Sequence, residues 1–358
     1  MTDSVSLIIL VAVQVQTIKS MLKSIYFFIC LCVQSLSYAQ AHLFFDKVIH
    51  QSLHQAKIVS VMKVKMTPEL MQTLERNASK VPVQKSTSSA SSSIQLGMNH
   101  IPVADQGYHG SCVTFAIIEA ISAIQSKPYS ELCTLSLGQY LENNGYKKSG
   151  WNGQMTRNVL ARIEDFGIVN LETQKSIGCG GLLEYPLDEK ESQPTNLEVF
   201  KQISEPIQKS GLGGWSNYYD VNQWINQNIP SEQILNQTKL ALHRHNRVII
   251  SVLLPIYMED FGAIGTYHSQ HDTWLANQDL MEAVVHIHEI FWLWGGHAMI
   301  ITGYDNEAIV YDKEGQAHQG VFTLRNSWGS GAGDHGDFYM TYDYFKLLAV
   351  ELNELSSK

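Results

Sequence analysis

A serine-rich stretch at residues 86–93 sets the limits within which this chain can fold. Its small polar side chains cannot form a hydrophobic core, which is typical of a flexible linker. The segment before it, residues 40–85, is too short to bury a stable core by itself. We therefore expect residues 40–85 to fold against a larger domain at 98–358, joined to it by a linker at 86–97. A small stabilising extension is the alternative interpretation of the first segment.

Charge separates the two parts of the chain as clearly as composition does. The 358 residues together carry a net charge of −9, whereas residues 40–97 carry +4 and residues 98–358 carry −14. These opposite charges predict attraction between the two parts. Because no basic cluster interrupts the acidic balance, we expect no nucleic acid partner. With 44% hydrophobic and 16% charged residues, the chain has the composition of a globular protein.

The first residues have the features of an export signal. Residues 25–33 form an apolar run after Lys23, and the small residues around Ala39 are typical of a signal-peptidase site. We expect residues 1–39 to be a signal peptide, with Met21 as the true start in place of Met1. The run is shorter than the roughly 20 residues that cross a bilayer, so a retained membrane helix is the weaker interpretation. The mature protein should be secreted or periplasmic, without stable membrane insertion.

The segment at 40–85 has a readable secondary structure. β-Branched residues at 42–49 and 57–66 predict two strands, and Thr67–Glu69 (TPE) predicts the start of a helix that ends near Asn77. These signals indicate a hairpin followed by a helix.

Cys112 is predicted to lie in the first turn of another helix. Gly110 and Ser111 precede it, and apolar residues at helical spacing follow it, beginning with Ala116. The start of a helix favours the thiolate, which is the nucleophilic form of cysteine, and a neighbouring imidazolium would lower the thiol pKa further. From this position alone, a buried structural cysteine is an equal alternative.

Two later segments contain the partners that such a thiolate needs. His297 opens an apolar strand in GGHAMIITGYD, and Asn326 ends the next strand in FTLRNSWG. A histidine can take the proton of a thiol and return it to a leaving group. An asparagine oxygen that accepts from the imidazole N–H would fix the tautomer and rotation of the ring. Neighbouring strands would bring the two side chains together.

The motifs GSC, GHA and NSWG, in this order, resemble those of the papain family of cysteine peptidases, which includes the cathepsins. The resemblance covers residues 98–350 and indicates a divergent, secreted, bacterial-type member. It implies that Cys112 is the nucleophile, His297 the general base and acid, and Asn326 the residue that orients the histidine.

The same resemblance implies three further site residues. Gln106, six residues before Cys112, corresponds to the amide that stabilises the oxyanion together with the Cys112 N–H. Trp328 corresponds to the indole that shields the His–Asn bond beside the bound substrate. Gly153 lies near the glycine whose backbone pairs with substrate.

The fold implied by the resemblance is α+β, with two lobes and a cleft between them. We expect a helical lobe at 108–190 and a barrel-like β lobe at 235–350, preceded by the hairpin and helix as a prosegment. The nucleophile and the histidine are 185 positions apart, more than the roughly 130–150 of the family. We therefore expect insertions at 190–230 and 257–292.

Two positions near the nucleophile depart from the family pattern. His109 stands where the family usually has a disulfide-bonded cysteine, and Val113 stands where an aromatic residue is usual. After removal of the signal, three cysteines remain in an exported chain, which favours one disulfide and one free thiol. We expect Cys133 and Cys179 to form a replacement disulfide, with two unpaired core thiols as the alternative.

The second insertion is rich in potential metal ligands, namely His268, His271, Asp272, His286, His288 and Glu289. A metal site or a carboxylate-binding pair would use such residues, but exposed polar loop residues are the default interpretation because no ligand spacing is established. We expect no metal and no organic cofactor.

The resemblance implies an exported cysteine peptidase that is made as a zymogen. Its substrates would be polypeptides, and its own propeptide at 40–85 would cover the cleft as an intramolecular inhibitor. Acid would loosen the propeptide, because carboxylates with pKa values near 4 lose their negative charge. A cysteine acyltransferase of the transglutaminase-like kind is the first alternative, and a non-catalytic binding protein is the second.

Overall fold

The computed structural model describes residues 44–53, 57–80, 92–207, 212–226, 229–287 and 294–357. The predicted signal peptide, residues 81–85 of the predicted propeptide and the first half of the predicted linker, residues 86–91, lie outside the described residues. All described residues belong to one structural unit, Leu43–Lys358. Within the described ranges, no helix is both long enough and apolar enough to cross a membrane.

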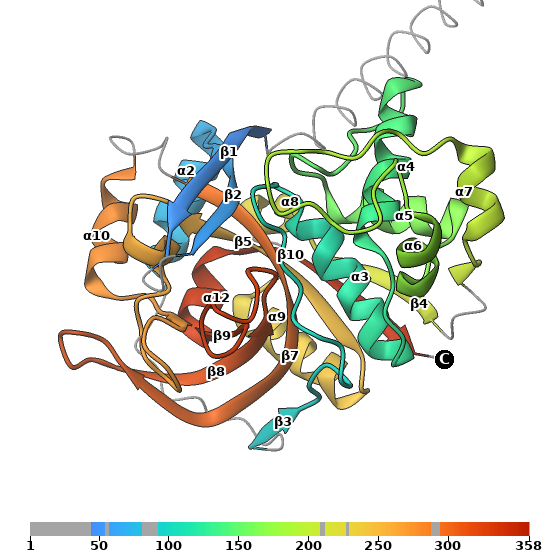
Figure 1. Ribbon diagram of the computed structural model, residues 1–358. Helices are drawn as coiled ribbons and strands as arrows, with labels where there is room; N and C mark the ends of the chain where they lie inside the picture. The colour runs from blue at the N-terminus through green and yellow to red at the C-terminus, as the bar shows by residue number, and fades with distance from the viewer. Residues whose placement is uncertain are drawn as a thin grey trace, which may run out of the picture. The chain divides into compact units, whose positions relative to one another are not determined.

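The first half of the large domain is helical. Its helices are α3 (Cys112–Gln125), α4 (Glu131–Asn143), α5 (Thr156–Phe166), α6 (Leu171–Ile177) and α7 (Leu197–Ile203). Helix α3 is central, because every residue from Cys112 to Ala123 is buried. It packs between α4 and α5 on one side and the sheet strands β5 and β7 on the other (Figure 1). The expected helical region is therefore present, and its first helix begins at the expected residue.

The second half forms an antiparallel sheet with helices on it. The strands are β4 (Leu212–Tyr219), β5 (Arg247–Pro255), β6 (Thr273–Trp274), β7 (Trp294–Tyr311), β8 (Ala317–Arg325), β9 (Asp337–Thr341) and β10 (Ala349–Ser357). Their order in the sheet is β4-β10-β5-β7-β8-β9-β6, in which only the β6–β9 pair is parallel. The accompanying helices are α8 (Val221–Asn226), α9 (Ser231–His243), the 3-10 turn η2 (Glu259–Gly262), α10 (Gln278–Val285) and α12 (Tyr342–Leu348). The α+β class expected from the sequence is confirmed.

The N-terminal segment forms the expected hairpin and helix. Strands β1 (Phe44–Ser52) and β2 (Ile58–Lys65) pair antiparallel, and α2 (Pro68–Ala78) follows them. Thr67 caps α2 by accepting from the N–H of Leu70, as its position before a proline predicts. The helix packs against α8, α10 and α12 (Figure 1).

Two short pairings attach this N-terminal part to the large sheet. Strand β2 pairs with the beginning of β7, where Met62 lies opposite Gly296 and Lys63 opposite Gly295. Strand β3 (Ser93–Gln95), which falls within the expected linker, pairs with β7 at Gly303–Asp305. A Cβ atom on Gly295 would lie 2.8 Å from Val61, so only glycine permits this close approach of β2.

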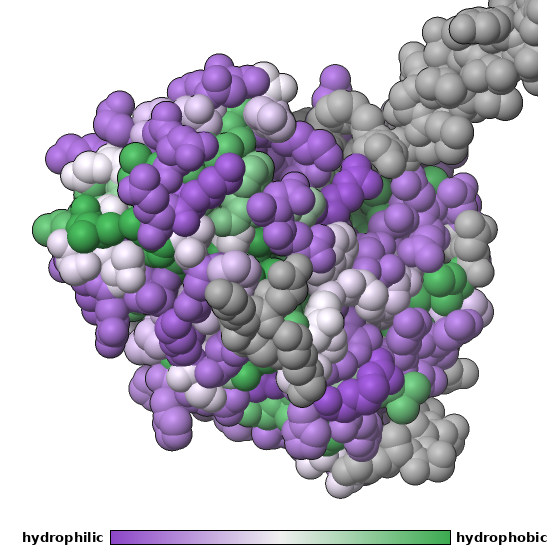
Figure 2. All heavy atoms as spheres, turned by 90° about the vertical axis from the view of Figure 1, so that its right-hand side faces the viewer, coloured by the Kyte–Doolittle hydropathy of each residue, from purple (hydrophilic) through white to green (hydrophobic). Residues whose placement is uncertain are grey.

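The side chains of the helical region divide into a core and a polar outer face. The apolar residues of α3 and α5 pack against those of β5 and β7, including Ile249 and Ile300. Figure 2 views the molecule from the side on which the helical region lies, and this face is mainly hydrophilic with scattered hydrophobic patches. The site described below is therefore built where the buried surface of α3 meets the sheet.

Candidate active site

Cys112 is a free, buried thiol at the start of α3. The expected disulfide between Cys133 and Cys179 is confirmed, which leaves Cys112 as the free cysteine among the described residues. Burial raises the pKa of the Cys112 thiol to about 11, although the backbone N–H groups of Ala298 and Val113 favour the thiolate. Ala298 directly follows His297, so the thiol lies beside the strand that carries the histidine.

His297 and Asn326 are brought together by the pairing of β7 with β8. The register sets Ile300 opposite Arg325, so the histidine and the asparagine lie at the same end of the strand pair. His297 Nε2 lies 2.8 Å from Asn326 Oδ1. Because an amide oxygen can only accept, Nε2 carries the proton and Nδ1 does not. Burial lowers the pKa of His297 to about 4, and the hydrogen bond that its Nε2–H donates to Asn326 partly offsets this effect.

The second nitrogen of His297 is available for chemistry. Its Nδ1 atom is buried and has no hydrogen-bond partner among the described residues. Cys112, His297 and Gly153 line one small, mainly apolar cavity. The structure therefore brings the predicted nucleophile, base and substrate-binding glycine to a common site.

Trp328 covers the imidazole. Its ring is fully buried and stacks on His297 with a centroid distance of 4.7 Å and an interplanar angle of 25°. Phe261 and Phe338 pack against the indole in turn. This arrangement keeps water from the His–Asn hydrogen bond, as expected from the family resemblance. Trp328 does not itself line the cavity that contains Cys112, but it stacks on His297, which does.

Gln106 is held from three directions. Its side-chain Nε2 donates to the carbonyl of His109 at 2.8 Å and to the carbonyl of Ser60 at 3.0 Å. Its Oε1 accepts from the hydroxyl of Ser327 at 2.7 Å, next to Asn326. Ser60 belongs to β2, so a backbone carbonyl of the N-terminal hairpin occupies a donor of the predicted oxyanion amide.

The hairpin also fills the space around Cys112. Met62 and Val64, from the inner face of β2, line the cavity shared by Cys112 and His297. Gly110 lies so close to Met62 that a Cβ at this position would collide with the methionine sulfur. Lys57 forms an ion pair with Asp105 at 2.5 Å, adjacent to Gln106. The hairpin therefore contacts both the cavity around Cys112 and the predicted oxyanion residue Gln106.

Sequence reasoning missed these hairpin residues. The residues at 57–66 predicted a strand, but a local strand signal does not say what the strand packs against. Sequence reasoning also missed Glu351, a buried carboxylate that lines the cavity of Cys112 and His297. Glu351 accepts hydrogen bonds from Thr156 Oγ1 at 2.8 Å and from Ser251 Oγ at 3.1 Å. Burial raises the pKa of Glu351, although these bonds oppose the shift.

The side chains of the second insertion that could bind a metal mostly form local hydrogen bonds and ion pairs. Asp272 accepts from the N–H groups of residues 267–269, which closes a tight turn. His268 lies 3.3 Å from Asp334, and His271 pairs with the buried Asp260 at 2.7 Å. Glu259, Asp260 and His271 place potential ligand atoms within 4.8 Å of one another. His288 and Glu289 lie outside the described residues.

Comparison with known proteins gives matches among solved structures only. No protein-family model and no curated protein matches the chain. Xylellain, a cysteine protease from Xylella fastidiosa, is 18% identical, with 79% of this chain and 89% of that chain covered and a TM-score of 0.43. The digestive procathepsin L 3 of Tenebrio molitor larval midgut is 15% identical, with 90% and 86% covered and a TM-score of 0.45. The Amb a 11 cysteine protease of ragweed pollen, in its proform, is 14% identical, with 77% and 70% covered and a TM-score of 0.43.

The solved structures that this chain resembles thus include cysteine proteases, the class whose motifs it resembles. These likenesses concern the fold. We therefore argue activity from the geometry of the site.

Proposed function

We propose that this protein is an exported cysteine peptidase made as a zymogen, with Cys112, His297, Asn326 and Gln106 as its catalytic residues. The observation that carries the proposal is the orientation of His297. Its Nε2–H bonds to Asn326, its Nδ1 has no hydrogen-bond partner among the described residues, and the residue lines the cavity that contains Cys112. Buried polar atoms are normally hydrogen-bonded, whereas a general base must keep one nitrogen free.

The chemistry follows from these atoms. His297 Nδ1 takes the proton of the Cys112 thiol, and the thiolate attacks the carbonyl carbon of a peptide bond. Gln106 Nε2 and the Cys112 N–H donate to the resulting oxyanion. The C–N bond then breaks, His297 returns the proton to the leaving amine, and water hydrolyses the thioester with His297 again acting as base. The products are an acid and an amine, and no external electrons are needed.

Two features support a latent state in the chain as synthesised. Burial stabilises the neutral thiol and the neutral imidazole, so the reactive thiolate–imidazolium pair is disfavoured. The carbonyl of Ser60 also occupies the amide that an oxyanion would need. Residues 40–85 would therefore act as an inhibitory propeptide until they are removed.

The charge distribution gives a means of release. The segment at 40–97 carries +4 and the domain at 98–358 carries −14. Protonation of carboxylates in acid removes the negative partners while lysine and arginine stay charged, so attraction weakens below about pH 5. Equal retention of the propeptide at pH 4 and pH 7 would contradict this mechanism of release.

Export is the remaining part of the proposal. The predicted signal at residues 1–39 would direct the chain out of the cytoplasm, and a disulfide such as Cys133–Cys179 persists in oxidising compartments. N-terminal sequencing of the secreted protein should give a start close to residue 40. A start at Met1 or Met21 in the extracellular fraction would contradict signal cleavage.

The decisive experiment is labelling of the purified full chain with a peptidyl epoxide that alkylates active-site thiols. Labelling should be slow before acid or protease treatment and fast after residues 40–85 are lost, and Cys112→Ala should abolish it. Fast labelling of the intact chain would be consistent with a peptidase but would refute the inhibitory role of the propeptide. No labelling in any form would refute the peptidase, and product formation only with an added amine would indicate an acyltransferase.

A further inference from the structure

We propose that Tyr185 is a positioning residue for the oxyanion donor Gln106. This inference rests on the peptidase function proposed above. Tyr185 Oη donates to the backbone carbonyl of Gln106 at 3.0 Å and lies 3.0 Å from Ser111 Oγ. Ser111 directly precedes Cys112, so one phenol links the two ends of the loop at 106–112.

The direction of these two hydrogen bonds is determined. The phenol has a single proton, and the Gln106 carbonyl can only accept, so Tyr185 donates there and Ser111 donates to Tyr185. Ser111 makes no side-chain cap to α3, which leaves its hydroxyl for this bond. Burial raises the pKa of Tyr185 well above its usual value, so the phenol keeps its proton at every relevant pH.

The ring of Tyr185 is held in place by aromatic neighbours. It stacks on Trp151 at 5.6 Å with an interplanar angle of 17°, and it meets Phe115 edge-on at 4.8 Å. Trp151 in turn meets the ring of His109 at 4.5 Å. These rings fix the phenol oxygen to within the tolerance that a hydrogen bond requires.

At the loop before Cys112, these aromatic contacts take the place of the disulfide that is usual in the resembled family. His109 occupies the position where the resembled family usually has a disulfide-bonded cysteine, and here its ring meets both Trp151 and Tyr185 edge-on. The His109 carbonyl accepts from Gln106 Nε2. The loop that carries the predicted oxyanion donor is thus held without a disulfide of its own, by these ring contacts and the Tyr185 hydroxyl in addition to the hydrogen bonds of Gln106 with Ser327 and His109.

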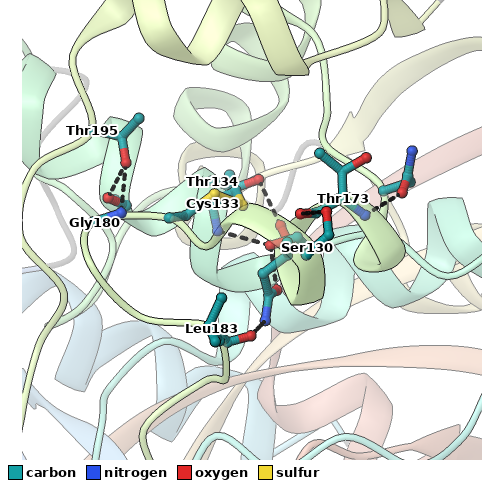
Figure 3. Close-up of a disulfide and its surroundings, with 12 residues drawn as sticks. Ser130, Cys133, Thr134, Thr173, Gly180, Leu183 and Thr195 are labelled. Atoms are coloured by element: carbon teal, nitrogen blue, oxygen red, sulfur yellow. Dashed lines mark hydrogen bonds between the residues drawn. A yellow bond between two sulfur atoms is a disulfide. The ribbon is translucent and has the colours of Figure 1, made fainter.

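The segment that carries Tyr185 is anchored to α4. The Cys133–Cys179 disulfide links the segment to that helix (Figure 3). Cys179 N also donates to the carbonyl of Leu182 at 2.9 Å. Gln174 Nε2 donates to the carbonyl of Leu183 at 2.9 Å (Figure 3). Tyr185, two residues later, therefore extends from a covalently fixed base toward Gln106.

The geometry indicates that loss of the Tyr185 hydroxyl would weaken oxyanion stabilisation by Gln106 more than the reactivity of Cys112. Cys112 is held by the backbone of α3, whereas Gln106 lies in a loop outside any helix or strand. Removal of an oxyanion donor typically lowers kcat by 10²–10³. Loss of the Tyr185 hydroxyl would loosen this donor without removing it, so we expect kcat to fall about tenfold, with KM unchanged.

The test compares Tyr185→Phe with wild type in the activated protein obtained from the full chain. A peptide aldehyde forms a hemithioacetal whose oxyanion uses the Gln106 donor, whereas iodoacetamide alkylates Cys112 without forming an oxyanion. We expect the inhibition constant of the aldehyde to rise about tenfold and the alkylation rate to stay within twofold. In a Gln106→Ala background, Tyr185→Phe should cause no further loss of kcat, because the two changes act on one donor.

Tyr342→Phe is the matched control. Its hydroxyl donates to Asn306 at 2.8 Å, so this variant also loses one buried hydroxyl while its ring is retained. It should leave kcat, aldehyde binding and alkylation unchanged. Melting temperatures of both variants verify folding, and Ser111→Ala, which removes the other hydroxyl of the network, provides a second variant with a smaller effect in the same direction.

Two results would overturn the inference and are distinguishable from failure of the proposed function. Unchanged aldehyde binding in Tyr185→Phe, or losses that add fully to those of Gln106→Ala, would refute the positioning role while wild type remains active. If activated wild type neither hydrolyses peptides nor reacts with the epoxide, the proposed function itself fails.

Discussion

His297 shows how two buried nitrogens of one ring receive different roles. Asn326 Oδ1 accepts from Nε2, and the same oxygen accepts from the Ser327 N–H at 2.8 Å, so the amide cannot rotate freely. Trp328 stacks on the ring and fixes its plane. The tautomer is thereby set before substrate arrives, which a base needs if it is to accept a thiol proton at Nδ1.

Replacement of Asn326 by alanine should therefore lower activity more than stability. The imidazole would lose its acceptor and its fixed rotation, and we expect kcat to fall about 10–100-fold, part of the 10²–10⁴ that acid–base catalysis contributes. Steady-state kinetics on the activated protein measures this. Asn306→Ala, which removes a buried acceptor of Tyr342 away from the site, should leave kcat unchanged. Equal losses in both variants would contradict the orienting role of Asn326.

Under the proposed function, the β1–β2 hairpin is the element that would control the reactivity of Cys112. Met62 and Val64 line the nucleophile cavity, and Ser60 accepts from Gln106. The hairpin is short and its contact with β7 spans only two residue pairs, so it depends on side-chain burial for its attachment.

Met62→Asp should release the hairpin. A carboxylate at this apolar position would be buried without a partner, at a cost of several kcal/mol, so the displaced hairpin becomes the favoured state. We expect the full chain to react with the epoxide at least tenfold faster at pH 7. Lys65→Ala, at an exposed position of the same strand, should react at the wild-type rate. A wild-type rate for Met62→Asp would show that Met62 is not needed to keep the thiol latent.

The pH dependence of alkylation should also differ between the two forms. In the full chain the pKa of Cys112 is raised to about 11, so its reaction with iodoacetamide should be slow at pH 7 and increase toward pH 11. Removal of the hairpin exposes the thiol and imidazole to water, which lowers the thiol pKa, so the processed form should react near neutral pH. Superimposable pH profiles would contradict control by burial.

Elements with local signals could be predicted from the sequence, whereas contacts between distant elements could not. Thr67 before Pro68 predicts the start of α2, and His297 and Asn326 follow from strand ends that any antiparallel pair would bring together. Tyr185 has no such signal, because its bond to Gln106 joins loops 79 residues apart. The register of β2 on β7 depends on the packing of Val61 against Gly295, which no local pattern reveals.

At the scale of the whole molecule, a buried histidine joins the sheet to its covering helix. His318 on β8 bonds to Asp343 on α12, and its other nitrogen lies 3.5 Å from Asp312. Burial opposes the imidazolium, but the hydrogen bond and charge of Asp343, with Asp312, outweigh it and raise the pKa of His318. For Asp343, burial would raise the pKa, but His318 outweighs it and lowers the pKa.

These two shifts define a window of greatest stability. The contribution of His318 is complete below its unfolded pKa near 6.5 and is lost as pH rises through its higher folded value. The contribution of Asp343 is lost as pH falls through its lowered folded value. Melting curves should show a decline in Tm above about pH 7, and His318→Gln should be less stable at pH 6 with a flatter profile above it. His243→Gln, at an exposed histidine bonded to Tyr304, should keep the wild-type slope. An unchanged slope in His318→Gln would contradict the assignment.

The attachment of β2 has a consequence for the protein after processing. The beginning of β7 pairs with β5 on one side, where Leu253 lies opposite Gly296, and with β2 on the other. Loss of the hairpin would leave the backbone groups of Gly295 and Gly296 without these strand partners, next to His297. Such an open edge accepts any extended chain through its main chain, and it also invites self-association of the kind that leads to aggregates. The hairpin would therefore also keep the unprocessed protein from aggregating, because it covers this edge of β7 until a substrate can pair with it.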